Sequence, residues 1–230
     1  MRRFEEDKAF YRVACKAQEL LGRNPACHDW DHTLRVLHNA RRLAESEHAD
    51  RRVVEYAAVL HDIGRSQEMA DQGLTCHAEL GAGQVPALLE TLGVRDVAFR
   101  DHVADCVRTH RFRRRRQETP RTLEARVVYD ADKLDAIGAV GIGRAFHFAG
   151  RTGARVHNTA SEALGSESYS RQDTAYREYL VKLQHVRENM LTESGRLEAE
   201  NRHRFMVEFF RELEREAAGA GGLDSNDRAH

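Results

Sequence analysis

Apolar residues recur at helical spacing along most of this chain, and the alternation typical of β-strands is scarce. Only three prolines occur in the 230 residues, at Pro25, Pro86 and Pro120. The pattern therefore predicts an all-α fold, in which packed amphipathic helices supply the core.

Helix start and stop signals divide the chain into expected elements. Asp50 is a favourable N-cap, and Gly22 and Gly64 are expected to follow helix ends. Leu34, Leu37 and Leu43 are expected to face the core. The expected helices span about residues 4–21, 29–47, 50–61, 75–92, 96–110, 123–148, 171–192 and 195–217. The expected non-helical connections are residues 65–74, the arginine-rich 111–122 and the Gly-, Ser- and Thr-rich 149–170.

Bulk properties exclude several classes of protein. The chain has 36 basic and 37 acidic residues and a net charge of −1, so nothing global points to nucleic acid. The N-terminus carries charged residues throughout, which is unlike a signal peptide. No apolar run approaches the roughly 20 residues of a membrane span. We expect a cytoplasmic protein with one domain over residues 1–218 and a disordered tail at 219–230.

The four cysteines, Cys15, Cys27, Cys76 and Cys106, form no CxxC pair. We expect free thiols. Cys27 and Cys76 each precede a histidine, so a thiolate ligand is the alternative.

Three segments combine histidine and aspartate in the way that metal sites require: HDWDHTLRV, LHDIGR and DADKLDAIG. They contain His32, His61, Asp62 and Asp132. Neutral imidazole and anionic carboxylate are ligands that borderline and hard divalent cations accept. The second segment follows the apolar run VVEYAAVL and the third begins in an apolar setting. Buried carboxylates are costly unless they are paired or bound to metal, so these settings favour a metal site.

Two more histidines, His77 and His110, are candidates for the same site. If they converge with the others, four histidines and two aspartates suffice for two metals, with Asp62 bridging them. His28 lies four residues before His32 and shares its helical face.

Together the three segments resemble the HD-domain superfamily of metal-dependent phosphohydrolases. Later segments, CHAELGA, THRF and LEARVVYDADKLDAIGAVGIGRAFHFAG, resemble a bacterial subgroup that includes manganese-dependent nucleotide pyrophosphohydrolases. The segment LTESGRLEAENRHRFMVEFF is similar to that subgroup's C-terminal helices, and the resemblance spans about residues 24–215. It implies an HD-domain helical bundle with its core at about residues 24–150 and additional C-terminal helices at about 171–217.

The resemblance implies that His32, His61, Asp62 and Asp132 bind a divalent metal. Mn²⁺ is the first expectation, with Mg²⁺, Co²⁺, Ni²⁺ and Fe²⁺ as alternatives. His77 and His110 match positions that hold a second metal in two-metal members; in one-metal members, equivalent histidines contact substrate phosphate. By the same resemblance, His28 contacts either a metal ligand or the substrate.

Arg65 stands where some superfamily nucleotidases have an acidic residue that orients the attacking water. A guanidinium fits phosphate oxygens, so we expect Arg65 to clamp phosphate, with Lys133 as a second phosphate contact. The sequence then leaves the identity of the general base open. The metal alone can lower the pKa of water, or Asp29 or Asp135 assists.

Five of the six residues at 111–116 are arginine. They are either a solvated surface or an anion funnel that steers a polyphosphate substrate. Arg113 and Arg114 are further candidates for phosphate contact.

The expected function is phosphohydrolysis of a nucleotide. The subgroup resemblance favours attack on the α-phosphorus of a nucleoside triphosphate with release of pyrophosphate. Alternatives are a nucleoside monophosphate phosphatase, a di-iron HD-domain oxygenase and a non-catalytic nucleotide-binding regulator. We expect a small-molecule nucleotide as partner and neither membrane nor nucleic acid. The sequence does not determine the oligomeric state, and a dimer is among the alternatives.

Overall fold

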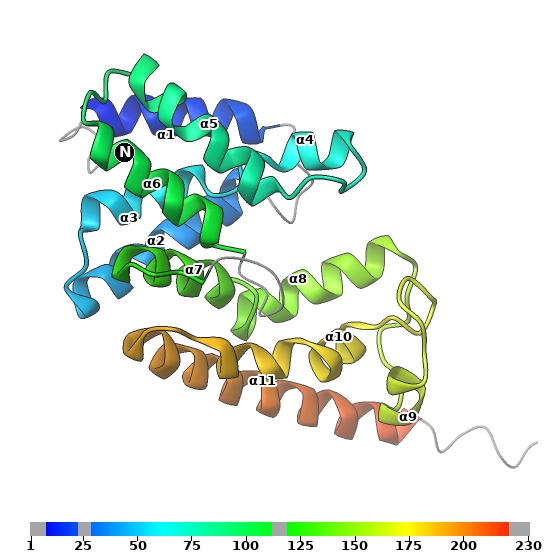
Figure 1. Ribbon diagram of the computed structural model, residues 1–230. Helices are drawn as coiled ribbons and strands as arrows, with labels where there is room; N and C mark the ends of the chain where they lie inside the picture. The colour runs from blue at the N-terminus through cyan, green and yellow to red at the C-terminus, as the bar shows by residue number, and fades with distance from the viewer. Residues whose placement is uncertain (1–7, 23–28, 112–118, 221–230) are drawn as a thin grey trace, which may run out of the picture. The chain divides into compact units, whose positions relative to one another are not determined.

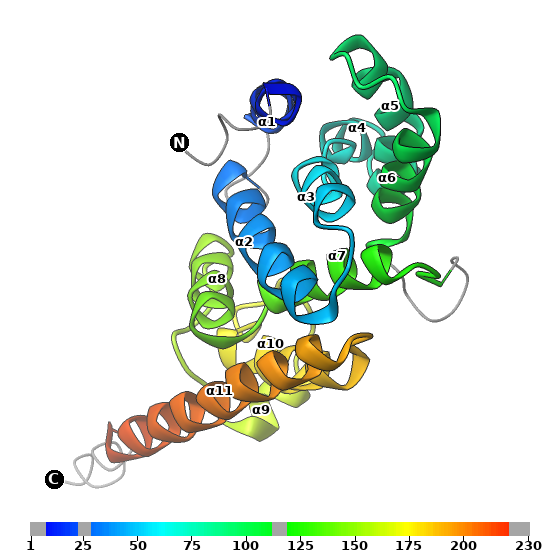
Figure 2. The same cartoon turned by 90° about the vertical axis from the view of Figure 1, so that its left-hand side faces the viewer.

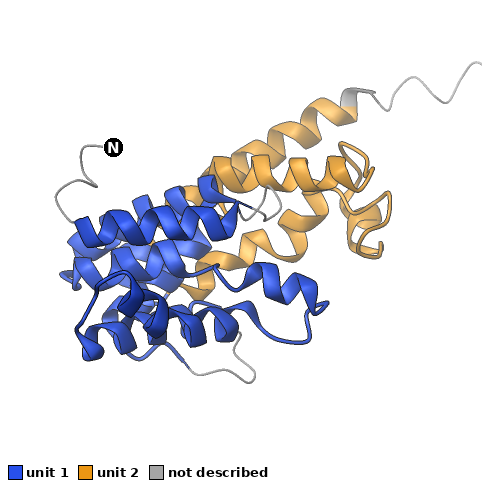
Figure 3. Cartoon of the chain, turned by 90° about the horizontal axis from the view of Figure 1, so that it is seen from above, with its two compact units in different colours: residues 1–135, 191–195 blue, residues 136–190, 196–230 orange. Residues whose placement is uncertain are grey.

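The computed structural model describes residues 8–22, 29–111 and 119–220, and in these residues it contains helices and no β-strand (Figure 1). The predicted all-α class is confirmed. The chain divides into two compact units (Figure 3). Unit 1 comprises Met1–Asp135 with Leu191–Gly195, and unit 2 comprises Ala136–Met190 with Arg196–His230. The expectation of a single domain over residues 1–218 remains a prediction.

Unit 1 is built from seven helices within its described residues. They are α1 (Lys8–Leu21), α2 (Trp30–Glu47), α3 (Arg51–Leu60), α4 (Arg65–Ala70), α5 (His77–Thr91), α6 (Val97–Thr109) and α7 (Leu123–Leu134). Helix α3 contacts α1, α2, α6 and α7, and it runs through the middle of the unit (Figure 2). Its residues Val53, Val54 and Tyr56–Leu60 are buried, as expected for a run that is apolar on nearly every side.

Polar caps set where these helices begin. The Asp29 carboxylate accepts a hydrogen bond from the His32 amide at 3.0 Å, and Asp50 accepts from the amides of Arg52 and Val53. Each cap satisfies amides that the first helical turn leaves without a partner. The predicted N-cap at Asp50 is confirmed. The cap at Asp29 fixes where α2 begins and therefore places His32 in the first turn of that helix.

The predicted loop at residues 65–74 is partly wrong, because α4 occupies Arg65–Ala70. None of its residues is buried, so the amphipathic pattern that reveals a helix in a sequence is missing. Leu34 was expected to face the core but is 37% exposed, whereas Leu37 and Leu43 are buried.

Unit 2 contains α8 (Gly138–Arg151), α9 (Ala160–Leu164), α10 (Ala175–Val181), the 3₁₀ helix η2 (Leu183–Asn189) and α11 (Glu193–Ala220) from Arg196 onward. The helix predicted over 123–148 is therefore two helices. Ile137 is extended and Gly138 has φ +75°, and neither conformation continues an α-helix. The helix predicted over 171–192 is also divided, because the backbone at Lys182 leaves the helical region.

Asp130 binds the segment Leu191–Gly195, which lies between the two parts of unit 2 in the sequence but belongs to unit 1. The fully buried carboxylate accepts hydrogen bonds from the Leu191 amide at 2.9 Å, the Thr192 amide at 2.8 Å and the Thr192 hydroxyl at 2.6 Å. A Cβ at Gly195 would lie 2.2 Å from the Asp130 Oδ2 atom. Only glycine therefore allows the chain to pass this close.

Three cysteines lie among the described residues, and Cys15, Cys76 and Cys106 all carry free thiols, as predicted. The disordered tail was predicted over residues 219–230, but residues 219 and 220 belong to α11. Cys27 and residues 221–230 lie outside the described residues. Among the helices described, none combines the length and the apolar character needed to cross a membrane.

Gly64 sets the distance between α5 and the turn that follows α3. A Cβ at this position would lie 2.3 Å from the His77 carbonyl oxygen and 2.7 Å from the Gly81 amide nitrogen. Both are backbone atoms, so the clash can be relieved only if α5 moves. The close approach brings His77, the first residue of α5, next to the turn that contains His61 and Asp62.

We expect Gly64→Ala to lower the free energy of unfolding by roughly 3 kcal/mol, because overpacking forces backbone shifts. Urea denaturation of the metal-free protein measures this. Gly83→Ala is the matched control: it lies in α5 with open space around its Cβ and should raise stability by up to about 1 kcal/mol. Equal stability of Gly64→Ala and the wild type would contradict the close-approach argument.

Candidate metal centre

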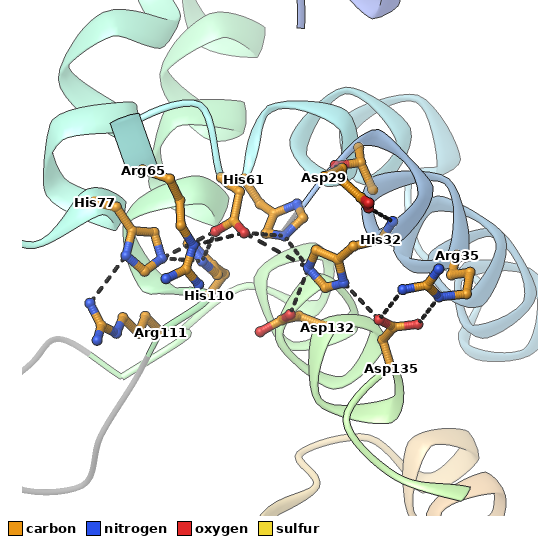
Figure 4. Close-up of polar contacts among 12 residues, drawn as sticks. Asp29, His32, Arg35, His61, Arg65, His77, His110, Arg111, Asp132 and Asp135 are labelled. Atoms are coloured by element: carbon orange, nitrogen blue, oxygen red, sulfur yellow. Dashed lines mark hydrogen bonds and ion pairs between the residues drawn. The ribbon is translucent and has the colours of Figure 1, made fainter. Parts of the chain in front are cut away.

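Six imidazole and carboxylate side chains from five helices or their ends meet inside unit 1 (Figure 4). His32 lies on α2, His61 and Asp62 follow α3, His77 begins α5, His110 follows α6 and Asp132 lies on α7. Five of the six are almost completely buried, and the Asp132 side chain is 17% exposed. The structure thus brings together all six of the residues singled out in the sequence.

His32, His61 and Asp132 form the first group of donors, with ligand atoms that all lie within 4.8 Å of one another. The Nε2 atoms of His32 and His61 are 3.2 Å apart, and His32 Nε2 is 3.5 Å from Asp132 Oδ1. Asp62 Oδ2 completes this group, at 3.8 Å from His32 Nε2 and 3.6 Å from His61 Nε2.

Asp62, His77 and His110 form the second group, again within 4.8 Å of one another. Asp62 Oδ1 lies 3.2 Å from His77 Nε2 and 3.6 Å from His110 Nε2, which are themselves 3.2 Å apart. The two oxygens of Asp62 therefore face different histidine pairs. This is the arrangement expected of a carboxylate that bridges two cations.

Hydrogen bonds on the outer side of the rings fix three of the imidazoles. His61 Nδ1 donates to the Ala58 carbonyl oxygen at 2.8 Å, and His110 Nδ1 donates to the Val107 carbonyl oxygen at 2.6 Å. His32 Nδ1 donates to Asp135 Oδ2 at 2.7 Å. In a neutral imidazole, a donating Nδ1 leaves a lone pair on Nε2. The Nε2 atoms of His32 and His61 thus face each other at 3.2 Å, a spacing that a shared proton or a metal cation between them would stabilise.

The electrostatics of the centre keep its candidate ligands in the protonation forms that can bind a metal. Burial lowers the pKa of His61 to about 3, against the opposing effect of Asp62. Burial also lowers the pKa of His77. For Asp132, burial acts to raise the pKa, but the Lys133 ammonium group and the surrounding imidazoles outweigh it and hold the pKa well below its usual range. Near pH 7 these groups are neutral imidazole and carboxylate, so a divalent cation would not have to displace their protons.

The three aspartates of DADKLDAIG have different surroundings. Asp130 binds the Leu191–Gly195 segment, Asp132 faces the histidines, and Asp135 bonds His32. Asp135 is also held by Arg35, through Nε at 2.7 Å and Nη2 at 3.1 Å. Both oxygens of Asp135 are thus engaged in orienting His32. Its predicted part as an assisting acid or base remains a prediction, as does that of Asp29, whose carboxylate caps α2.

The two predicted phosphate contacts lie beside the ligand carboxylates. Arg65 Nε donates to Asp62 Oδ2 at 2.9 Å, and Lys133 Nζ donates to Asp132 Oδ2 at 2.7 Å. Both side chains are partly exposed, at 21% and 28%. Neutralising groups therefore stand at the edge of the centre. His28, Arg113 and Arg114 lie outside the described residues.

Sequence reasoning missed three residues around the centre. Glu68 on α4 accepts a hydrogen bond from His77 Nδ1 at 2.8 Å, and Arg111 contacts Glu68 on the other side. Arg35 lies one helical turn after His32 and holds Asp135. The spacing of Arg35 was a usable signal, since residues three apart share a helical face. Glu68 gave no signal because α4 was expected to be a loop.

Three comparisons identify related proteins. An HD domain model matches residues 29–137, the part of the chain that holds all six candidate ligands. The Bacillus subtilis (strain 168) protein YpgQ is 35% identical over 217 residues, which cover 94% of this chain and 97% of YpgQ. The crystal structure of YpgQ in complex with ADP matches with a TM-score of 0.69 at 32% identity and covers 95% of this chain and 98% of that one.

Two further crystal structures carry the superfamily in their names. A predicted HD superfamily hydrolase from an uncultured Thermotogales bacterium matches at 31% identity and a TM-score of 0.64, over 90% of this chain and 91% of that one. An HD-superfamily hydrolase from Bacillus thuringiensis matches at 28% identity and a TM-score of 0.69, over 91% and 96%. With the histidine and aspartate centre described above, these matches show that the chain belongs to the HD-domain superfamily of hydrolases.

Proposed function

We propose that this hydrolase is a metal-dependent nucleoside triphosphate pyrophosphohydrolase, which releases pyrophosphate from the nucleotide. The observation that carries the metal dependence is the position of Asp62, with one oxygen toward His32 and His61 and the other toward His77 and His110. His32, His61, Asp62 and Asp132 would hold a first divalent cation. Asp62, His77 and His110 would hold a second one.

The donor set fits a divalent cation such as Mn²⁺. It combines neutral nitrogen with anionic oxygen, which suits borderline and hard metals. When bound, the cation supplies Lewis acidity toward a phosphoryl oxygen and lowers the pKa of water. The protein's own contribution is to fix the donors in place through Ala58, Val107 and Asp135, so that the site is ready before substrate arrives.

Arg65 and Lys133 are proposed to bind the phosphate chain. A guanidinium has five N–H donors in a rigid fork, so the contacts of Arg65 with Asp62 and Glu68 still leave donors for phosphate oxygens. Lys133 supplies a compact positive charge beside Asp132. Both would neutralise negative charge that builds up as the anhydride bond breaks.

Two independent points support a nucleotide substrate. YpgQ, which is similar over nearly its whole length, crystallised in complex with ADP. The subgroup that the sequence resembles includes nucleotide pyrophosphohydrolases, and this favours attack at the α-phosphorus. A nucleoside monophosphate phosphatase would use the same donors and is separated from the proposal by its product.

The second donor group also favours one alternative chemistry. Four histidines and two aspartates are also the ligand set of di-iron oxygenases in this superfamily, which the sequence analysis keeps as an alternative. Two measurements distinguish this oxygenase from the hydrolase: which metal the purified protein holds, and whether the protein consumes oxygen.

The proposal is tested by product analysis in water enriched in ¹⁸O with added Mn²⁺. We expect a nucleoside triphosphate to give nucleoside monophosphate and pyrophosphate, with ¹⁸O in the monophosphate. Asp62→Ala should lower kcat/KM roughly 10³-fold or more while helical content by circular dichroism is unchanged. Asp101→Ala, an exposed aspartate on α6, is the matched control and should retain full activity.

Other outcomes of this assay would overturn parts of the proposal. Orthophosphate released from a monophosphate as the preferred substrate would replace it with a phosphatase. Two irons per chain with oxygen consumption and no hydrolysis would favour the oxygenase. Full activity of Asp62→Ala would remove the assigned centre from the reaction.

Arg65→Ala should raise KM for a nucleoside triphosphate about 10-fold, because one charge-assisted contact to phosphate is lost. Arg65→Lys keeps the charge and loses the fork, so it should fall between Ala and the wild type. Steady-state kinetics measure both, with Arg95→Ala as a control at an exposed position outside the centre. An unchanged KM in Arg65→Ala would exclude it from the phosphate clamp.

Stability of the metal-free protein should fall as the pH is lowered from about 6.5 toward 3. The pKa of His61 is lowered to about 3 in the folded state, so in this window the unfolded chain binds a proton that the folded chain does not. His61 alone contributes a slope of up to about 1.4 kcal/mol per pH unit. Urea titrations at several pH values measure it. His61→Asn should flatten the dependence, whereas His38→Asn, at an exposed position of α2, should not.

A further inference from the structure

Among the four histidines of the centre, His77 differs in that its Nδ1 atom lies within hydrogen-bond distance of both a carboxylate and a guanidinium. His61 and His110 donate to backbone carbonyl oxygens, and His32 donates to the buried Asp135. The Nδ1 atom of His77 instead meets two side chains. Glu68 Oε2 lies at 2.8 Å, and Arg111 Nη1 lies at 3.1 Å (Figure 4 shows the contact to Arg111). A carbonyl can only accept, so it imposes one tautomer. At His77 no carbonyl fixes the tautomer, so the side chains of Glu68 and Arg111 determine it.

The two neighbours demand opposite tautomers of a neutral His77. Glu68 accepts, so it requires a proton on Nδ1 and leaves a lone pair on Nε2, toward Asp62 Oδ1 at 3.2 Å. Arg111 can only donate, so it would require a bare Nδ1 and place the proton on Nε2. Only the first tautomer can ligate a cation through Nε2.

On the inner side, Asp62 Oδ1 would also accept from an Nε2–H, but at 3.2 Å this contact is longer than the 2.8 Å contact to Glu68, so the geometry favours Glu68. Its distance to Nδ1 is the shorter of the two, and a carboxylate acceptor makes a charge-assisted bond. The guanidinium of Arg111 has its own acceptor in the other oxygen of the same carboxylate, Glu68 Oε1. Arg111 thus holds Glu68 in place, and its proximity to Nδ1 follows from that ion pair.

We propose that Glu68 is a positioning residue: it fixes His77 as the Nδ1–H tautomer and thereby creates the second cation position. This role rests on the proposed function, since it gives the second position its nitrogen lone pair. Arg111 acts one step further out, as the anchor of Glu68.

The surroundings of Glu68 make it suitable for substitution. It lies on the short helix α4, on the wall of an open cavity of about 610 Å³ that Met69, Leu74, Cys76 and Arg111 also line. Removal of its carboxylate would widen this cavity and leave no closed void in the core. Variants at this position should therefore fold.

The direct test is ¹⁵N NMR of the imidazole nitrogens in metal-free protein, which distinguishes a protonated nitrogen from one with a lone pair. We expect the Nδ1–H tautomer for His77 in the wild type. Glu68→Ala should convert it to the Nε2–H tautomer, because Arg111 can then donate to Nδ1. Glu68→Gln retains an acceptor oxygen and should preserve the wild-type tautomer. A wild-type His77 protonated on Nε2, or no change in Glu68→Ala, would overturn the proposal.

Calorimetric titration with Mn²⁺ alone gives a second readout. Glu68→Ala should weaken the second equivalent of Mn²⁺ about 10- to 100-fold, as expected when an outer partner of a ligand histidine is lost, and leave the first unchanged. Glu79→Ala is the matched control, an exposed acid on α5 two residues after His77. Equal loss of both equivalents would contradict a role through His77.

The two experiments separate the failure of this inference from the failure of the proposed function. If wild-type protein binds only one Mn²⁺, the second cation position is wrong, and the tautomer of His77 in Glu68→Ala still decides whether Glu68 positions it. If two Mn²⁺ bind and Glu68→Ala changes neither the affinities nor the tautomer, only the role of Glu68 is lost.

Discussion

The buried carboxylate of Asp62 lies between two pairs of imidazoles, and unit 1 is arranged so that these groups can meet. A carboxylate in the interior is costly unless charges or hydrogen bonds compensate it. Here Arg65 donates to Asp62 Oδ2, and the four histidines that different helices supply would hold the cation that completes the compensation. Two local features allow these helices to bring the histidines to Asp62. Gly64 lets α5 approach the turn after α3, and Asp29 fixes where α2 begins.

The outer contacts of the histidines explain why the centre suits a cation. Backbone carbonyls and Asp135 hold three Nδ1 atoms as donors, so the Nε2 lone pairs converge on common points. Helix ends contribute to this, since Ala58 and Val107 lie three residues before the histidines that they orient. The same turn of helix thus places each histidine and selects its tautomer.

Membership of the HD-domain superfamily and the positions of the charged side chains both favour metal-dependent phosphohydrolysis. Arg65 and Lys133 stand beside ligand carboxylates at the partly exposed edge of the centre, where an anionic substrate would arrive. In the proposed function, these two cationic side chains would bind phosphate, and the histidine and aspartate donors would bind metal. Glu68 and Arg111 add an outer layer on the side of His77.

The sequence alone determined the all-α class and the candidate ligands, because helical periodicity and the spacing of histidine and aspartate are local properties. It also gave the N-cap at Asp50. It did not reveal α4, whose residues are all outside the core, or the break at Ile137 and Gly138, where backbone conformation overrides an apolar pattern. The tertiary structure alone decided which group each imidazole faces. A bridging Asp62 was expected only if His77 and His110 converged with the other candidates, and the tertiary structure brings them there. Asp135 holds His32, and Glu68 lies against His77 from a helix that was not predicted. No local pattern encodes these two contacts.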